Sequence, residues 1–280
     1  MSSILIWNCR GARKKQTGHY LRSLVGINEV CFVGLVETMV MDMSRMEVDR
    51  LIGSEWEFFH FPANGRSGGL IALWKRDVSK FEVLGNMKQV LIGSLIFPNM
   101  QRWIIVVVYA SKGYHSRCLL WNTISPLNSL DLPVIVGGDF NCCLNQSEKK
   151  GGRRYNFSVG AQEMSEFMVD SDLHDLGFLG PKYTWSNNKS GHSKIWVRLD
   201  RILMNSEGLR RAPLAMVKQL VRLTSDHCPL LLNLFAEIPR PGNRWIRFEE
   251  IWMTYPITWS LGGWFGRTGP RRIMECLMRW

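Results

Sequence analysis

Short apolar runs alternate with mixed segments along the first 236 residues. The runs are rich in Val and Ile and span residues 4–7, 30–36, 69–74, 103–108, 133–136 and 202–204. Continuous apolar runs of this length are typical of strands with both faces buried, although a short buried helix can give the same pattern. The pattern therefore predicts a set of buried strands.

Amphipathic stripes lie between some of these runs and predict helices. Thr17 is placed to cap the first helix, which stops at Gly26. Residues 161–173 predict a third helix. The apolar positions of the three stripes are Tyr20, Leu21, Leu24 and Val25, then Leu120, Ile124 and Leu127, and finally Met164, Phe167 and Met168. Strands interleaved with helices predict an α/β chain, with two sheets face to face and helices outside.

The last 44 residues differ in composition from the rest. They hold five of the 12 tryptophans, seven arginines and no lysine, and four prolines interrupt them. Prolines at this density break regular elements. We therefore predict a domain of residues 1–236, followed by a poorly ordered C-terminal extension of residues 237–280.

The charge of the chain predicts a polyanionic partner. Its net charge is +11 and its pI is near 9.5, which suits nucleic acid or an acidic membrane face. Seven scattered cysteines without a C-x-x-C pair indicate neither a disulfide framework nor a zinc ribbon. No secretion signal is recognisable, and no run approaches the roughly 20 apolar residues of a membrane span. We expect a soluble nuclear or cytoplasmic protein that is not secreted and has no membrane partner.

Polar residues stand where several apolar runs end. Asn8, Glu37 and Tyr109 each follow such a run, and Asp139 and Asn141 follow the run that ends in two glycines. Functional groups at the strand ends of one sheet can converge on a single cleft. Two further segments carry similar chemistry, R-L-D-R-I-L with Asp200 and T-S-D-H-C-P-L with Asp226 and His227.

Each of these positions also has a simpler interpretation. An Asn or Glu that ends a strand is usually a turn residue, and Tyr109 alone is typical of a core position. Asp200, flanked by Arg198 and Arg201, fits an exposed ion pair. The functional interpretation depends on the joint occurrence of these residues in this order.

In this order the motifs resemble those of the endonuclease/exonuclease/phosphatase superfamily. The matching segments are W-N-C-R-G, L-V-E-T, V-Y-A, G-D-F-N, L-D-R-I-L and S-D-H-C-P, between residues 4 and 234. The resemblance implies a two-layer β-sandwich flanked by helices, the four-layer α/β/β/α fold of DNase I.

Other segments resemble the endonuclease domain of plant LINE-type (non-LTR) retrotransposons. They are S-E-K-K-G-G at 147–152, D-L-G-F-L-G-P-K-Y-T-W-S-N at 175–187 and R-L-D-R-I-L at 198–203. R-W-I-R-F-E-E-I-W at 244–252 resembles the segment adjoining that domain on its C-terminal side, and the match stops there. The resemblance implies that residues 237–280 are the remnant of a linker toward a missing reverse transcriptase.

Phosphodiester chemistry and the resemblance together suggest a metal site. Glu37 with Asn8 offers hard oxygen ligands for Mg²⁺, which Mn²⁺ can replace, and Asp226 binds the ion directly or through water. We expect no small-molecule cofactor.

The same reasoning suggests roles for the other polar residues. Asp139 would deprotonate the attacking water, and Asn141 would hydrogen-bond the phosphate or that water. His227 would contact a non-bridging oxygen, with its ring held by Asp200. Tyr109 would donate its hydroxyl to the phosphate.

Two clusters of basic residues follow the motifs and are candidates for DNA contacts. The residues are Arg10, Arg13, Lys14 and Lys15 after Asn8, and Lys149, Lys150, Arg153 and Arg154 after Asn141. Solvated loops are the alternative. Trp185 and Trp196 could stack on bases, but core packing is favoured for both.

The sequence thus predicts an Mg²⁺-dependent endonuclease that nicks DNA and leaves a 3′-hydroxyl. Two alternatives remain open. One is a superfamily phosphatase acting on another phosphoester, and the other is a decayed element copy that acts at most as a basic nucleic-acid binder.

Overall fold

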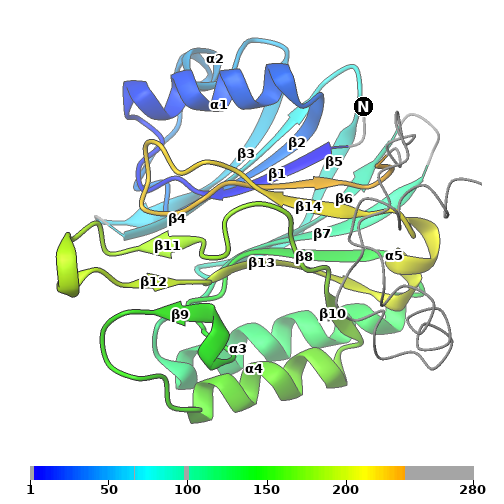
Figure 1. Ribbon diagram of the computed structural model, residues 1–280. Coiled ribbons are helices and arrows are strands. Elements are labelled where there is room, and N and C mark those ends of the chain that lie inside the picture. Colours follow the sequence, from blue (N-terminus) through cyan, green and yellow to red (C-terminus); the bar gives the residue numbers. More distant parts are fainter. Residues whose placement is uncertain (1–2, 66, 98–100, 237–280) are drawn as a thin grey trace, which may run out of the picture. The chain divides into compact units, whose positions relative to one another are not determined.

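Two six-stranded sheets form the centre of the computed structural model, which describes residues 3–65, 67–97 and 101–236 (Figure 1). The first sheet has the order β14 (Met216–Gln219), β15 (Leu230–Asn233), β1 (Ser3–Asn8), β2 (Val30–Val36), β4 (Ser67–Lys75) and β3 (Trp56–Asn64). The second has the order β10 (Leu173–Asp175), β13 (Asp200–Asn205), β8 (Val134–Asp139), β7 (Arg102–Tyr109), β6 (Val90–Ile96) and β5 (Lys80–Met87). The predicted extension, residues 237–280, lies outside the described residues.

Helices cover the outer face of each sheet (Figure 1). The first sheet packs against α1 (Lys15–Ile27) and α2 (Arg45–Leu51), and the second against α3 (Tyr114–Ile124) and α4 (Val159–Asp170). The short helix α5 (Ser206–Arg211) follows β13, and the 3-10 helices are η1 (Ser125–Leu130), η2 (Gln146–Glu148) and η3 (Gly191–Ser193). The predicted four-layer α/β/β/α fold is confirmed. No described helix combines the length and apolar character that a membrane crossing requires.

The strand pattern of the sequence results from burial on both faces of each sheet. In β1, Ile4 and Ile6 point into the core between the sheets, whereas Leu5 and Trp7 pack under the helices. Fully burying such a side chain contributes about 1.5–3 kcal/mol, so both faces must be apolar. This is why the central strands appear in the sequence as continuous apolar runs.

The strands that the sequence pattern missed have a different burial. In β5, exposed and buried positions alternate, and β3 is only partly covered. In β6 the apolar run is interrupted by Gly93, where the Phe81 ring leaves no room for a Cβ. The predicted cap at Thr17 is wrong, because α1 begins at Lys15 and the Thr17 hydroxyl donates to the Gly11 carbonyl instead (3.1 Å).

Each sheet contains one pair of parallel strands, and this pairing sets the position of the polar strand ends. β1 runs parallel to β2 with Asn8 opposite Val36, and β7 runs parallel to β8 with Tyr109 opposite Asp139. The antiparallel β13 places Asp200 opposite Asp139. Residues far apart in sequence therefore meet at one edge of the sandwich.

The β7–β8 pairing depends on a close backbone approach at Gly138. This glycine has φ +145°, and a Cβ there would lie 2.0 Å from the Val108 carbonyl oxygen. We expect Gly138→Ala to lower the free energy of unfolding by about 1–3 kcal/mol, measured by urea denaturation. Gly85→Ala is the matched control, because a Cβ at Gly85 meets nothing within 4 Å. Equal stabilities of the two variants would contradict this prediction.

Candidate active site

Five segments bring the predicted polar residues together at this edge. Asn8 ends β1, Glu37 follows β2, and Asp139 ends β8. Asp200 begins β13, and His227 lies just before β15. The loop that carries His227 is tied to β1, because the Ser225 hydroxyl donates to the Asn8 carbonyl (2.8 Å) and accepts from the His227 N–H (3.1 Å).

Asn8 is the hub of the cluster. Its buried Nδ2 donates to Glu37 Oε2 (3.0 Å) and to Asp139 Oδ2 (2.9 Å), and it lies 3.5 Å from His227 Nε2. The side-chain oxygen of Asn8, Oδ1, is buried without a hydrogen-bond partner among the described residues. A buried oxygen left unpaired is costly unless a ligand completes it.

His227 is held between two carboxylates. Its Nδ1 lies 2.9 Å from Asp200 Oδ2, and its Nε2 lies 3.7 Å from Asp139 Oδ2. Burial disfavours the charged ring, but the charges of Asp200 and Asp139 outweigh burial and raise the pKa of His227 to about 9. The ring is therefore cationic at neutral pH.

Asp139 is fixed on both sides of its carboxylate. Asn141, with φ 46°, donates its backbone N–H to Asp139 Oδ1 (2.9 Å), while its own Nδ2 donates to the Ala110 carbonyl (2.8 Å). Burial, with a contribution from the Asp200 charge, raises the pKa of Asp139 to about 7. A carboxyl group with a pKa near neutrality is suited to accept and release protons.

Tyr109 belongs to both the core and the site. Its ring is half-buried and packs against the core between the sheets. Burial and the charges of Glu37 and Asp139 raise the pKa of its hydroxyl, which therefore stays protonated as a hydrogen-bond donor.

The carboxylates of Glu37 and Asp226 both pair with the guanidinium of Arg10. Arg10 Nη1 lies 2.5 Å from Asp226 Oδ2, and Arg10 Nε lies 3.4 Å from Glu37 Oε1. The indole N–H of Trp185 also donates to Asp226 Oδ2 (3.0 Å), whereas Asp226 Oδ1 is buried without a partner among the described residues.

The donor set fits a hard divalent cation. Among the side chains of this cluster, Asn8 Oδ1 and Asp226 Oδ1 are buried oxygens without a partner, and Glu37 supplies a carboxylate that accepts from Asn8. Asp139, Asp200 and His227 also place ligand atoms within 4.8 Å of one another. In that trio, however, His227 Nδ1 already pairs with Asp200, and Mg²⁺ prefers oxygen ligands. The oxygens of Asn8, Glu37 and Asp226 are the better match.

The basic residues predicted to contact DNA lie in different places. Arg10 enters the site, whereas Arg13 pairs with Glu47 (2.8 Å) and donates to the Asp42 carbonyl. The other six are on or beside the loops, and all but the half-buried Lys149 are exposed: Lys14, Lys15, Lys149, Lys150, Arg153 and Arg154. Lys149 and Lys150 form β9, which joins β12 (Trp196–Val197) and β11 (Trp185–Ser186) in a small third sheet.

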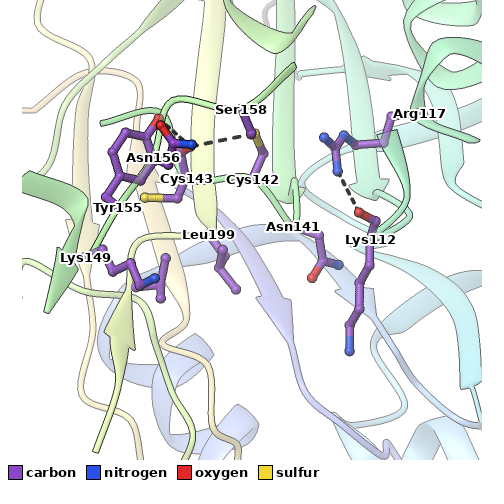
Figure 2. A pocket seen from close by; sticks show the side chains of 11 residues that line it. Lys112, Arg117, Asn141, Cys142, Cys143, Lys149, Tyr155, Asn156, Ser158 and Leu199 are labelled. Atoms are coloured by element: carbon purple, nitrogen blue, oxygen red, sulfur yellow. Dashed lines mark hydrogen bonds between the residues drawn. The ribbon is translucent and has the colours of Figure 1, made fainter. Parts of the chain in front are cut away.

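A pocket of about 320 Å³ opens beside Asn141 (Figure 2). Lys112 and Lys149 line it together with Asn141, Tyr155 and Leu199. Two lysines and two neutral polar side chains make this wall attractive to anionic groups.

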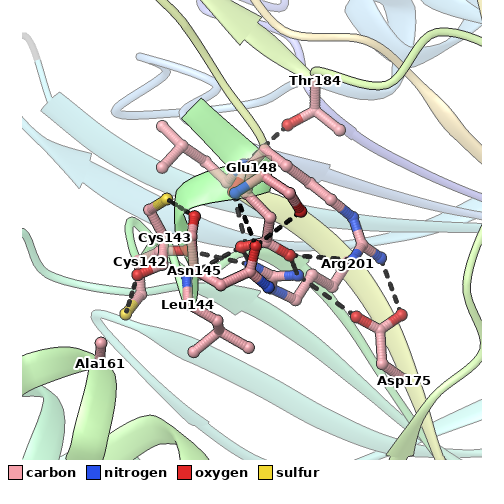
Figure 3. A network of polar contacts seen from close by, with 12 residues as sticks. Cys142, Cys143, Leu144, Asn145, Glu148, Ala161, Asp175, Thr184 and Arg201 are labelled. Atoms are coloured by element: carbon pink, nitrogen blue, oxygen red, sulfur yellow. Dashed lines mark hydrogen bonds and ion pairs between the residues drawn. The ribbon is translucent and has the colours of Figure 1, made fainter. Parts of the chain in front are cut away.

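A buried ion-pair network supports the loop that carries β9 (Figure 3). The fully buried Arg201 reaches Glu148 Oε2 (2.5 Å) and Asp175 Oδ2 (3.3 Å), and Arg198 contacts the same two carboxylates at 3.2 and 2.7 Å. The interpretation of Arg198, Asp200 and Arg201 as an exposed ion pair is therefore wrong. Both arginines pair with other acids, and Asp200 is left for His227.

Several supporting residues were not identified from sequence. Thr184 Oγ1 accepts the backbone N–H groups of Leu199 and Asp200 (2.9 and 3.0 Å), and Ser225 anchors the His227 loop. The favoured core packing of Trp185 and Trp196 is wrong, because both are half-buried in the small third sheet, where Trp185 donates to Asp226 and Lys194 and Arg222 lie over the Trp196 ring. No periodic pattern marks such residues, because their partners are distant in sequence.

Comparison with known proteins places this geometry in context. The model described as the Endonuclease/Exonuclease/phosphatase family matches residues 5–227. No curated protein sequence matches the chain significantly.

Solved structures share the fold at low sequence identity. AP endonuclease LMAP from Leishmania major matches with a TM-score of 0.64 and 17% identity, over 82% of this chain and 86% of that one. The endonuclease domain of TRAS1, a telomere-specific non-LTR retrotransposon, matches with a TM-score of 0.63 and 16% identity, over 83% of this chain and 98% of that one. The 3′-5′ exonuclease NExo from Neisseria meningitidis matches with a TM-score of 0.64 and 14% identity, over 84% of this chain and 100% of that one.

Proposed function

The chain belongs to the endonuclease/exonuclease/phosphatase family, and from this we propose that it is a divalent-metal-dependent endonuclease that nicks DNA and leaves a 3′-hydroxyl. Members of the family are hydrolases of phosphoester bonds, and its nucleases generally use divalent metals. We further propose the retrotransposon type, in which the 3′-hydroxyl primes reverse transcription. The plant LINE-like segments of the sequence support this choice, as does the similar fold of the TRAS1 endonuclease domain.

The observation that carries the proposal is the convergence on Asn8. The buried Nδ2 of this amide contacts Glu37, Asp139 and His227, and its Oδ1 has no hydrogen-bond partner among the described residues. A structural hydrogen-bond network would be expected to satisfy that oxygen. An unsatisfied oxygen in a cluster of acids instead favours a site built for a cation.

The residues divide into metal ligands and reacting groups. Held by Asn8, Glu37 and Asp226, an Mg²⁺ or Mn²⁺ ion would supply positive charge against the charge that develops on the phosphate. Asp139 accepts the proton of the attacking water, and the backbone N–H of Asn141 fixes the carboxylate for this step. These assignments follow the hydrogen bonds of the site.

Two donors would bind the non-bridging phosphate oxygens. Protonated His227, oriented by Asp200, donates from Nε2, and Tyr109 donates from its hydroxyl. Donors that are already in place stabilise the transition state without reorganisation. The side chain of Asn141 is held by Ala110 and borders the pocket of Figure 2, beside Lys112 and Lys149.

DNA is favoured as the substrate by charge and by the position of the lysines. The net charge of +11 attracts a polyanion, and Lys149 and Lys150 lie on the small sheet next to the site. We propose nuclear or cytoplasmic action on this basis.

A nicking assay tests the proposed function. The full-length chain is incubated with supercoiled plasmid and Mg²⁺, and we expect open circles that form with Mg²⁺ or Mn²⁺ and not with EDTA. The nicked ends should support extension by a DNA polymerase, because they carry a 3′-hydroxyl. His227→Ala should lose the activity.

Failure of the assay has a clear meaning. No metal-dependent conversion by a folded chain would contradict the nuclease and favour a decayed copy. Hydrolysis of a soluble phosphomonoester in place of plasmid DNA would favour the phosphatase alternative.

A further inference from the structure

Arg10 occupies an unusual place among the basic residues of the chain. Its guanidinium bridges Glu37 and Asp226, two of the three proposed metal ligands. Arg13, three residues later, points instead to Glu47. Arg10 is therefore part of the acidic cluster, and the contacts of this cluster limit how many cations it can hold.

The backbone fixes Arg10 in this position. The N–H groups of Cys9, Gly11 and Ala12 donate to the carbonyls of Val36, Glu37 and Thr38 at 3.1, 3.0 and 2.9 Å. The backbone of Arg10 adopts φ 48°, a conformation that residues other than Gly, Asn and Asp rarely take. This pairing of the two strand ends aims the guanidinium at the two carboxylates.

The oxygens of the cluster are already divided between partners. Glu37 Oε1 faces Arg10 and its Oε2 accepts from Asn8, while Asp226 Oδ2 faces Arg10 and Trp185. Among the described oxygens of these ligands, Asn8 Oδ1 and Asp226 Oδ1 have no protein partner, and Glu37 can reach an ion only with an oxygen that Arg10 or Asn8 already contacts. A pair of divalent ions lies about 3.5–4 Å apart, and a second ion at that distance would have to displace Arg10 from the carboxylates that it contacts.

We propose that Arg10 is the fixed second cation of this active site, so that the site binds one divalent ion where a two-metal site would bind two. This inference rests on the proposed metal dependence. The guanidinium neutralises Glu37 and Asp226 and repels a further divalent ion from the space between them. Asn8, Glu37 and Asp226 would hold the remaining ion.

The stoichiometry of Mn²⁺ binding tests the proposal. Free Mn²⁺ is followed by electron paramagnetic resonance during titration of the full-length chain without DNA. We expect one ion for the wild type and for Arg10→Lys, which keeps the charge. We expect two ions for Arg10→Asn, because asparagine tolerates the left-handed backbone and frees both carboxylates.

Arg76→Asn is the matched control. Arg76 is an exposed arginine that pairs with Glu57 (2.8 Å) and follows the C-terminal end of β4. Glu37 lies near the other end of β4, where its neighbours Val36 and Thr38 pair with Leu70 and Gly69. Arg76→Asn removes the same charge from an exposed carboxylate, which Arg45 still contacts (3.5 Å), and it should still bind one ion. Two ions in this control would assign the extra ion of Arg10→Asn to net charge and overturn the proposal.

The remaining outcomes are also decisive. Two ions on the wild type, or one ion on a folded Arg10→Asn, would overturn the role of Arg10 and leave the proposed nuclease untouched. No ion on the wild type would contradict the metal-dependent nuclease itself.

Discussion

Asp139→Asn is expected to lower the rate of DNA nicking by about 10²–10⁴-fold, the usual contribution of a general base. Asparagine has the shape of aspartate but cannot accept the proton of the attacking water. Its side-chain oxygen can still accept the Asn141 N–H, which now donates to Asp139 Oδ1, while its NH₂ group replaces the oxygen that accepts from Asn8 Nδ2. The local backbone should therefore be preserved.

Affinity for DNA separates this loss from a loss of binding. Because the change removes a negative charge, DNA binding at constant salt should be equal or tighter, measured by fluorescence anisotropy with EDTA present. Asp77→Asn is the control, since Asp77 is exposed in the turn between β4 and β5. Nicking by Asp139→Asn at the rate of this control would remove Asp139 from the proposed role.

Arg201→Met is expected to lower the free energy of unfolding by about 3–5 kcal/mol, because it leaves the buried carboxylate of Glu148 without its main partner. Arg201 has no exposed side-chain surface and contacts both Glu148 and Asp175 (Figure 3). Arg198 still reaches both acids, which places the expected loss at the lower end of this range. Urea denaturation of the full-length chain measures it.

Arg210→Met is the matched control for the ion-pair network. Arg210 pairs with Glu207 through two contacts of 2.8 Å, but its side chain is 72% exposed, so its removal should leave stability almost unchanged. A loss for Arg201→Met as small as that of this control would show that the buried network adds nothing.

The pH dependence of the same variant gives a second check. Burial alone would raise the pKa of Glu148, but Arg201 outweighs burial and lowers it, and Arg198 does the same for Asp175. A lowered pKa stabilises the fold above the unfolded values, about 4.3 for Glu and 3.9 for Asp, and this contribution is lost as pH falls through the folded values. The difference between wild type and Arg201→Met should therefore shrink below about pH 4.

The fold was predictable where burial is uniform. β2 was located at residues 30–36 because both of its faces are covered and every position is apolar. β5 was missed because one face is open, and its alternating pattern contains no apolar run. Periodicity thus identified the centres of the sheets better than their edges.

The site was predictable as a set of residues and not as a set of contacts. The motif resemblance selected Asn8, Asp139 and His227, but the contacts of Asn8 with the other two, across 131 and 219 residues, depend on the pairing of strands. The charge run after Asn8 suggested a DNA-binding loop, whereas tertiary structure turns Arg10 inward to Asp226. A local run of charges carries no information about such a partner.

The pairing of β1 with β15 also has a consequence for when activity can appear. Ile4 lies opposite Leu232, and the Trp7 indole donates to the His227 carbonyl (3.3 Å), so the first described strand is completed by the last. Contacts between such distant residues form slowly, after the loops between them have closed. A nascent chain emerging from the ribosome would contain Asn8 and Glu37 long before His227. The candidate site therefore cannot assemble until the chain has been made as far as β15.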